Sequence, residues 1–266
     1  MPSGKSSKSV RNARAIVTAT KPKPWGTIAA VVVVVLFAGA IFAYMYTRYQ
    51  DVSAFKPTAD RKDPSTQIEG VVTHDYGAGR GHIGADKRVA YDRSPPFGGP
   101  HDGVWAACNG VVYSTPVRNE NMVHSLEHGA VWIAYNPEQI TGSALQSLQD
   151  RVRGQNYLML SPYPGLDTPI SLQSWGHQLK LADPADKRID HFVQALRLNP
   201  YTYPEIGASC DAVPGSFDPA TPPPFVATPP GPDAVPLDFA GGLNAPTGGG
   251  TAPTGPQSES NPPAGG

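Results

Sequence analysis

The sequence predicts an α+β fold: one domain outside the membrane, with a small sheet and packed helices, between a single transmembrane helix and a disordered tail. Three observations lead to this expectation. Residues 25–47 form an uncharged apolar run, the patterns from residue 130 onward follow the order β-α-β-β-α, and proline and glycine dominate from residue 211. The intervening residues 67–210 are sufficient to bury one hydrophobic core.

The apolar run at residues 25–47 is long enough to span a membrane as a helix, because a helix rises ~1.5 Å per residue and the hydrocarbon core is ~30 Å thick. Trp25 lies at one end and three tyrosines lie at the other, where the headgroup region favours aromatic rings. A cleaved signal peptide is the alternative. We disfavour it because such apolar regions are usually only ~7–15 residues long and residues 42–46 are too bulky for a cleavage site.

The charge distribution predicts the orientation of this helix. Residues 1–24 hold six basic residues and no acidic one, a net charge of +6, so the positive-inside rule places them in the cytoplasm and the main domain outside it. All 22 acidic residues but only 14 of the 21 basic residues follow residue 50, a net charge of −8 there. This balance argues against a nucleic-acid partner, because phosphate contacts need a basic face. We expect a single-pass plasma-membrane protein that meets proteins of an envelope or membrane complex.

Two segments lack the pattern of a folded domain. Residues 48–66 are polar without periodicity, which predicts a short stalk. Residues 211–266 contain 14 prolines, 10 glycines and no basic residue. Such a composition buries too little apolar surface to offset the chain entropy, so we expect a disordered, partly polyproline tail.

Local patterns predict the elements of the domain. Runs of apolar and β-branched residues indicate strands at residues 68–74, 131–135, 157–160, 170–175 and 178–181. Three helices are expected: at residues 119–128, where Gly129 supplies the stop, in a segment that starts at Asn136-Pro137, and between Asp183 and Asn199.

The chain has two cysteines, Cys108 and Cys210, and both follow the apolar run. An even number of cysteines in an oxidising compartment predicts a disulfide. It would close a loop of about 100 residues, for which the loop-entropy estimate is about 4–5 kcal/mol. Two buried free thiols are the alternative.

The stretch of residues 119–135 carries the strongest chemical signal. His124 and His128 are four residues apart and share one face of the expected helix, which allows both to bind one metal ion. Met122 adds a thioether, provided that residues 121–124 are extended, and His101 adds an imidazole from a neighbouring loop. This donor set favours copper ahead of zinc. The residues expected to support these ligands from behind are Glu127, His74 and His82.

Two other interpretations of this stretch remain open. The sequence from His124 to His128 reads His-x-x-Glu-His, the inverted zinc-protease motif, so a metal-dependent hydrolase using His124, Glu127 and His128 is the enzymatic alternative. Glu205 lies 77 positions after His128, a suitable distance for a third ligand, but its Tyr-Pro-Glu-Ile-Gly context is not helical and we set it aside. The histidines also fit a buried hydrogen-bond network that fixes a loop.

Several blocks of the sequence carry a family resemblance. They are Pro95-Pro96-Phe97-Gly98-Gly99-Pro100-His101, Gly110-Val111-Val112-Tyr113, the run Val-His-Ser-Leu-Glu-His-Gly-Ala-Val-Trp-Ile at 123–133, and Ser-Pro-Tyr-Pro-Gly-Leu at 161–166. Together these blocks resemble domain-of-unknown-function family 3105, a group of bacterial proteins that usually carry one N-terminal membrane helix. The resemblance covers about residues 67–208. It implies an anchored extracytoplasmic domain and no activity, because the family has none assigned.

Taken together, the sequence predicts a membrane-anchored, non-enzymatic protein whose histidine-rich site binds copper or zinc, or a partner protein. The compact domain offers no complete catalytic set, which is the reason for placing the hydrolase second.

Overall fold

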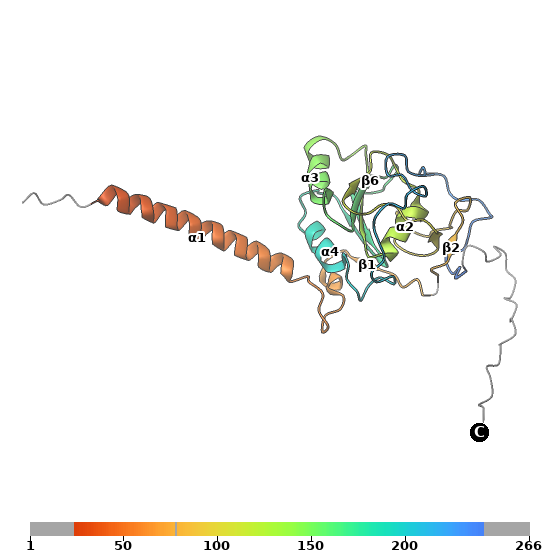
Figure 1. The fold of residues 1–266 in the computed structure, drawn as a ribbon, viewed down its shortest axis with the longest axis horizontal. Helices are drawn as coiled ribbons and strands as arrows, with labels where there is room; N and C mark the ends of the chain where they lie inside the picture. The colour runs from red at the N-terminus through yellow and green to blue at the C-terminus, as the bar shows by residue number, and fades with distance from the viewer. Residues whose placement is uncertain (1–23, 78, 242–266) are drawn as a thin grey trace, which may run out of the picture. The chain divides into compact units, whose positions relative to one another are not determined.

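The computed structural model describes residues 24–77 and 79–241 (Figure 1). The first helix, α1, is Trp25–Ser53, and its segment Trp25–Asp51 is long and apolar enough to cross a membrane. A signal sequence near the N-terminus would pass the same test by length and composition. Of the basic segment predicted at residues 1–24, residues 1–23 lie outside the described residues.

The residues from Gln50 onward form a separate compact unit built on a mixed six-stranded sheet. Its strands, in spatial order, are β1 (Val72–Thr73), β8 (His177–Leu181), β7 (Ile170–Ser174), β5 (Val131–Tyr135), β6 (Leu158–Pro162) and β4 (Val111–Val112). β4 and β5 each run parallel to β6, whereas the pairs from β5 through β7 and β8 to β1 are antiparallel.

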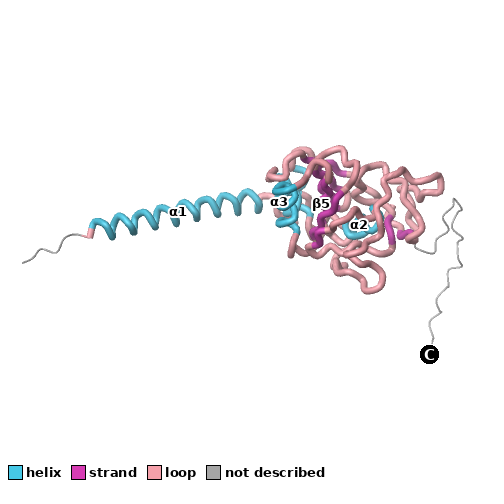
Figure 2. Tube along the Cα trace, turned by 90° about the horizontal axis from the view of Figure 1, so that it is seen from above, coloured by secondary structure: helices cyan, strands magenta, loops and turns pink. Residues whose placement is uncertain are grey.

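Alternate side chains of the strands pack on the two faces of this sheet. On one face, Val131 and Ile133 of β5 join a hydrophobic cluster with α3 (Gly142–Val152) and α4 (Arg188–Leu196). On the other face, Trp132 and Ala134 join a second cluster with α2 (Asn119–Glu127) and nearby loops. Figure 2 shows α3 and α2 on opposite sides of β5. This arrangement confirms the predicted α+β class.

A short second sheet lies beside α2. It pairs β2 (His82–Ile83) with β3 (His101–Asp102) in parallel, and the register sets His82 opposite His101. Because α2 packs against β3, histidines from three separate segments of the chain meet at this point.

Two predicted boundaries are corrected by side-chain hydrogen bonds. The Asn136-Pro137 signal makes a turn and not a helix start: the Asn136 side chain accepts from Glu138 N at 2.9 Å and donates to Leu166 O at 2.9 Å. α3 begins only at Gly142. In the same way, Asp183 accepts from Ala185 N at 2.8 Å, which forms a turn ahead of α4.

The predicted stalk at residues 48–66 is structured where the chain approaches the domain. α1 continues to Ser53, and a 3-10 helix, η1, covers Pro64–Gln67. Phe55 stacks on His191 with ring centroids 4.3 Å apart, and Asp63 Oδ2 lies 3.1 Å from His177 Nε2. These residues were expected to be a spacer because they lack periodicity, but single side chains attach them to the domain.

Residues 211–241, which we call the strap, also differ from the prediction. Val235 forms a parallel bridge with Val89, and Val117 pairs with Pro224. Phe217 and Val235 are buried among core residues. The composition argument fails here because a few apolar side chains suffice when each fills a site on an existing domain. The remainder of the predicted tail, residues 242–266, lies outside the described residues.

Candidate metal centre

Four histidines come together from the two short strands and the helix. His82 belongs to β2, His101 to β3 and His124 to α2, while His128 is the residue that caps α2. Neighbouring rings in this cluster have centroids 4.6 to 4.9 Å apart. All except His82 are buried.

Backbone carbonyls fix the orientation of three of these rings. The Nδ1 atoms lie 2.9 Å from Gly99 O for His101, 2.6 Å from Asp102 O for His124 and 2.6 Å from Ser209 O for His128. A carbonyl can only accept, so each Nδ1 carries the proton, and in a neutral ring Nε2 is then a free lone pair. Metal-binding histidines are held by their other nitrogen in this same manner.

Two carboxylates face the free Nε2 atoms. Glu127 Oε2 lies 2.8 Å from His101 Nε2 and 3.8 Å from His82 Nε2, and Glu205 Oε2 lies 3.2 Å from His128 Nε2. Although 2.8 Å is a hydrogen-bond distance, the approach to His101 Nε2 lacks hydrogen-bond geometry. This buried nitrogen and that of His82 have no hydrogen-bond partner among the described residues.

These side chains form two groups of candidate ligands that share one histidine. The inner group is His82, His101, His124 and Glu127, and the outer group is His124, His128 and Glu205. Within each group the ligand atoms lie within 4.8 Å of one another. Atoms around a tetrahedral zinc ion are separated by roughly 3.4 Å, so small side-chain movements would close either group on an ion.

Burial and mutual repulsion keep the central histidine neutral. Burial lowers the pKa of His124 to about 2, and the neighbouring His101 and His128 act in the same direction. Burial alone would raise the pKa of Glu127, but His101 and His82 outweigh it and lower this pKa to about 2. At neutral pH the cluster therefore offers an anionic carboxylate and an unprotonated His124, the forms that bind a cation.

A buried ion pair supports β3 from behind. The Arg118 guanidinium binds the carboxylate of Asp102 and, at 3.2 Å, that of Glu120. Asp102 Oδ1 also accepts from Val104 N at 2.8 Å. Since Asp102 O holds the His124 ring, these contacts fix a ligand as well as a strand.

The disulfide supports the outer group. Cys108 and Cys210 are joined, as predicted, with Cys108 N donating to Cys210 O at 2.9 Å. The neighbouring carbonyl of Ser209 holds His128. Trp105 packs on His128 with centroids 4.8 Å apart and donates from Nε1 to Asp211 O at 2.8 Å. The segment that carries Glu205 is thereby tied to the face of α2.

The described site residues lie within one sequence family. The family described as Protein of unknown function (DUF3105) matches residues 82–212. Residues 82–212 are therefore similar to this family. This match confirms the resemblance carried by the proline-rich and His-Glu-His blocks. The matched region begins at His82 and ends just after Cys210, so it contains both candidate ligand groups and the disulfide. No curated protein and no solved structure matches the chain.

The structure places some of the predicted site residues in the candidate ligand groups and others elsewhere. Glu127 and His82 lie among the candidate ligands and not behind them. Met122 is fully buried in the hydrophobic cluster on the α2 face of the sheet, because α2 is helical through residues 121–124. His74 stacks on Tyr76 with centroids 4.6 Å apart and belongs to neither group. Glu205, which we set aside on sequence context, lies 3.2 Å from His128 Nε2, because its loop brings it there without any helix.

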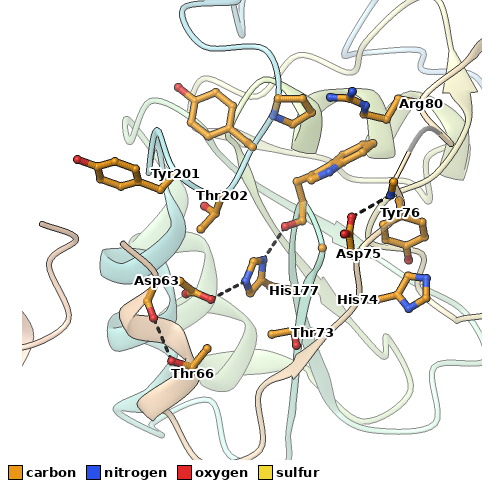
Figure 3. A pocket seen from close by; sticks show the side chains of 15 residues that line it. Asp63, Thr66, Thr73, His74, Asp75, Tyr76, Arg80, His177, Tyr201 and Thr202 are labelled. Atoms are coloured by element: carbon orange, nitrogen blue, oxygen red, sulfur yellow. Dashed lines mark hydrogen bonds and ion pairs between the residues drawn. The ribbon is translucent and has the colours of Figure 1, made fainter. Parts of the chain in front are cut away.

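A separate pocket of about 560 Å³ opens beside β1 and β8 (Figure 3). His74, Asp75, His177 and Tyr201 are among its lining residues, and no member of the two ligand groups lines it. His177 donates from Nδ1 to Trp175 O at 2.6 Å, and its Nε2 faces Asp63. With both ring nitrogens engaged, His177 joins η1 to the sheet and is not free to act as a base.

Proposed function

We propose that the matched region, residues 82–212, binds one divalent transition-metal ion, zinc or copper, through the inner group. The observation that carries this proposal is the orientation of two inner-group imidazoles: the Nδ1 atoms of His101 and His124 are held by backbone carbonyls, which leaves the Nε2 atom of each ring free, and Glu127 Oε2 lies 2.8 Å from that of His101. Four ligands of this type are the number and kind that a tetrahedral site requires. Glu127 supplies one negative charge to offset the charge of the ion.

A hydrogen-bond network without metal accounts less well for the same atoms. When the His101 ring is neutral and its hydrogen is on Nδ1, its Nε2 atom is an acceptor, and so is the Glu127 carboxylate. These two acceptors nevertheless lie 2.8 Å apart in a buried site. A cation between them relieves this contact.

The donor set changes the expected order of metals. Copper ranked ahead of zinc because of the Met122 thioether, and the structure gives Met122 a place in the hydrophobic core. Imidazole and carboxylate ligands suit zinc and divalent copper equally well. We therefore propose a divalent ion and no longer rank copper first.

The membrane placement is part of the proposal. The apolar helix α1 and the basic residues 1–24 support a single-pass protein with a cytoplasmic N-terminus and the metal-binding domain outside the plasma membrane. In that position the domain would meet proteins of an envelope or membrane complex. A buried disulfide fits an oxidising compartment.

The hydrolase is the second candidate, and Glu205 is the observation that favours it. His124, His128 and Glu205 would be the ligands and Glu127 the base. The low pKa of Glu127 counts against this role, because an efficient general base has a pKa near the working pH. Peptide hydrolysis by the zinc-loaded chain that disappears in Glu127→Gln would support the hydrolase.

Metal content of the full-length chain, purified in detergent, tests the binding proposal. We expect one equivalent of zinc or copper after dialysis against micromolar metal. His101→Gln combined with Glu127→Gln should reduce the affinity, whereas His74→Gln, a matched histidine outside both groups, should leave it unchanged. A wild-type chain that binds neither metal would leave the hydrogen-bond network as the correct interpretation.

A further inference from the structure

We propose that the outer group is an exchange position for the same ion, which enters and leaves the inner group by way of His128 and Glu205. This inference rests on the metal site proposed above and assigns a separate role to the three outer side chains. One ion occupies either position, and His124 remains its ligand in both.

The shared histidine limits the cluster to one ion at a time. His124 Nδ1 is 2.6 Å from Asp102 O and donates its hydrogen there. Its Nε2 is then the one lone pair available to a metal. Since a neutral imidazole cannot bind two ions through a single lone pair, filling the outer position empties the inner one.

The two positions differ in ligand number and in exposure. The inner group has four members, including the fully buried His101, while the outer group has three. The Glu205 side chain is 43% exposed, against 5% for that of Glu127. The outer position therefore binds more weakly and opens to solvent, which suits an ion in transit.

The transfer is a ligand substitution without redox change. The bonds from the ion to His101, His82 and Glu127 break, the bonds to His128 and Glu205 form, and the bond to His124 stays. The hydrogens stay on the Nδ1 atoms and remain donated to the carbonyls throughout, so no proton moves. The His101, His124 and His128 rings lie in sequence, with centroids 4.7 and 4.6 Å apart, so the ion has only a short distance to cover.

A second opening offers the competing route. The His82 side chain is 34% exposed and belongs to the inner group. An ion that left past His82 would never meet His128 or Glu205. The rate of release therefore distinguishes the two routes, because only the proposed one depends on the outer side chains.

Release kinetics from the zinc-loaded full-length chain in detergent test this proposal. Transfer of zinc to excess EDTA should slow in His128→Gln and in Glu205→Gln, with little change in equilibrium affinity. Glu205→Gln is the decisive variant, because its side chain is exposed and its loss does not disturb the core. His74→Gln and Glu138→Gln serve as matched controls and should release zinc at the wild-type rate.

Stoichiometry supplies the independent measurement. Wild type should bind one equivalent of cobalt(II), used as a spectroscopic probe, even at high metal concentration. His101→Gln with Glu127→Gln should retain one weaker equivalent with an altered visible spectrum, and adding His128→Gln should remove it. Two equivalents in wild type, or release that ignores both outer variants, would overturn the exchange position and leave the inner site standing. A wild-type chain without metal would instead defeat the proposed function itself.

Discussion

At the scale of single residues, the site depends on backbone carbonyls more than on side-chain partners. Gly99 O, Asp102 O and Ser209 O each hold one imidazole. A carbonyl orients a ring without adding charge to the cluster. Moving the backbone that carries these carbonyls would turn the rings.

The buried Arg118 offers a direct test of this backbone support. Arg118→Met should lower the free energy of unfolding by about 3–5 kcal/mol, because it leaves the carboxylates of Asp102 and Glu120 buried and unpaired. Urea unfolding at neutral pH measures this loss. The control is Arg153→Met, which removes an exposed pair with Asp150 and should change stability by less than about 1 kcal/mol. Equal effects of the two substitutions would contradict the role given to Arg118.

Asp63 should make stability depend on pH. Burial raises its pKa, but His177 and Ser65 outweigh burial and lower the pKa below the usual 3.8. A lowered pKa in the folded state stabilises the fold above the unfolded value, and this contribution is lost as the pH falls through the folded value. Asp63→Asn should therefore be less stable than wild type at pH 6, and the difference should shrink as the pH falls below the usual value of 3.8. A difference that stays constant as the pH falls would refute this account.

The sequence predicted part of the site for a clear physical reason. The spacing of His124 and His128 fixes them on one face of a helix, so the pair could be inferred from local geometry. The approach of His82 and His101 depends on pairing between two-residue strands, which leaves no periodic pattern. Glu205 reaches His128 from a loop held by the disulfide, a long-range contact that local context cannot indicate.

At the scale of elements, the predicted helix and strands near α2 agree closely with the structure. α2 spans residues 119–127 and ends where Gly129 adopts a φ of +89°, a conformation that favours glycine. β5 has the predicted bounds because its run is apolar on both faces. The start of α3 was wrong because an Asn-Pro pair caps a turn as readily as a helix.

The disulfide connects the segment just before β4, which carries Cys108, with the segment that follows Glu205. Cys108→Ser with Cys210→Ser should lower the free energy of unfolding by about 4–5 kcal/mol, as expected for a loop of about 100 residues. It should also weaken any metal binding that depends on Glu205. Alkylation of the unreduced, denatured chain followed by mass spectrometry checks the premise: two modified thiols would disprove the bridge.

At the scale of the whole molecule, the strap makes the folded domain longer than the family match. The match ends at residue 212, whereas bridges and buried side chains continue to Val235. Neither the proline content nor the low apolar content reveals this, because the strap has no core of its own. The strap is stabilised by packing against surfaces of the rest of the domain.

Substitution of Phe217 tests how much the strap contributes to the free energy of unfolding. Its buried ring lies edge-on to Tyr113, with centroids 6.3 Å apart. Phe217→Ala should lower the free energy of unfolding by about 3–5 kcal/mol. The exposed Val226 is the matched position, and Val226→Ala should have little effect. If thermal and urea unfolding gave the same value for both variants, the strap would not belong to the cooperative unit.

The end of the strap also lies next to a candidate metal ligand, His82. Gly81 N donates to Phe239 O at 3.0 Å, and His101 N donates to Gly81 O at 3.1 Å. Residue 81 directly precedes His82, so the last described part of the chain is hydrogen-bonded to the backbone beside the partly exposed His82 ring. A force that pulled on the end of the strap would thus act through these two hydrogen bonds on both β2 and β3. The force would reach the histidine cluster before it reached the six-stranded sheet.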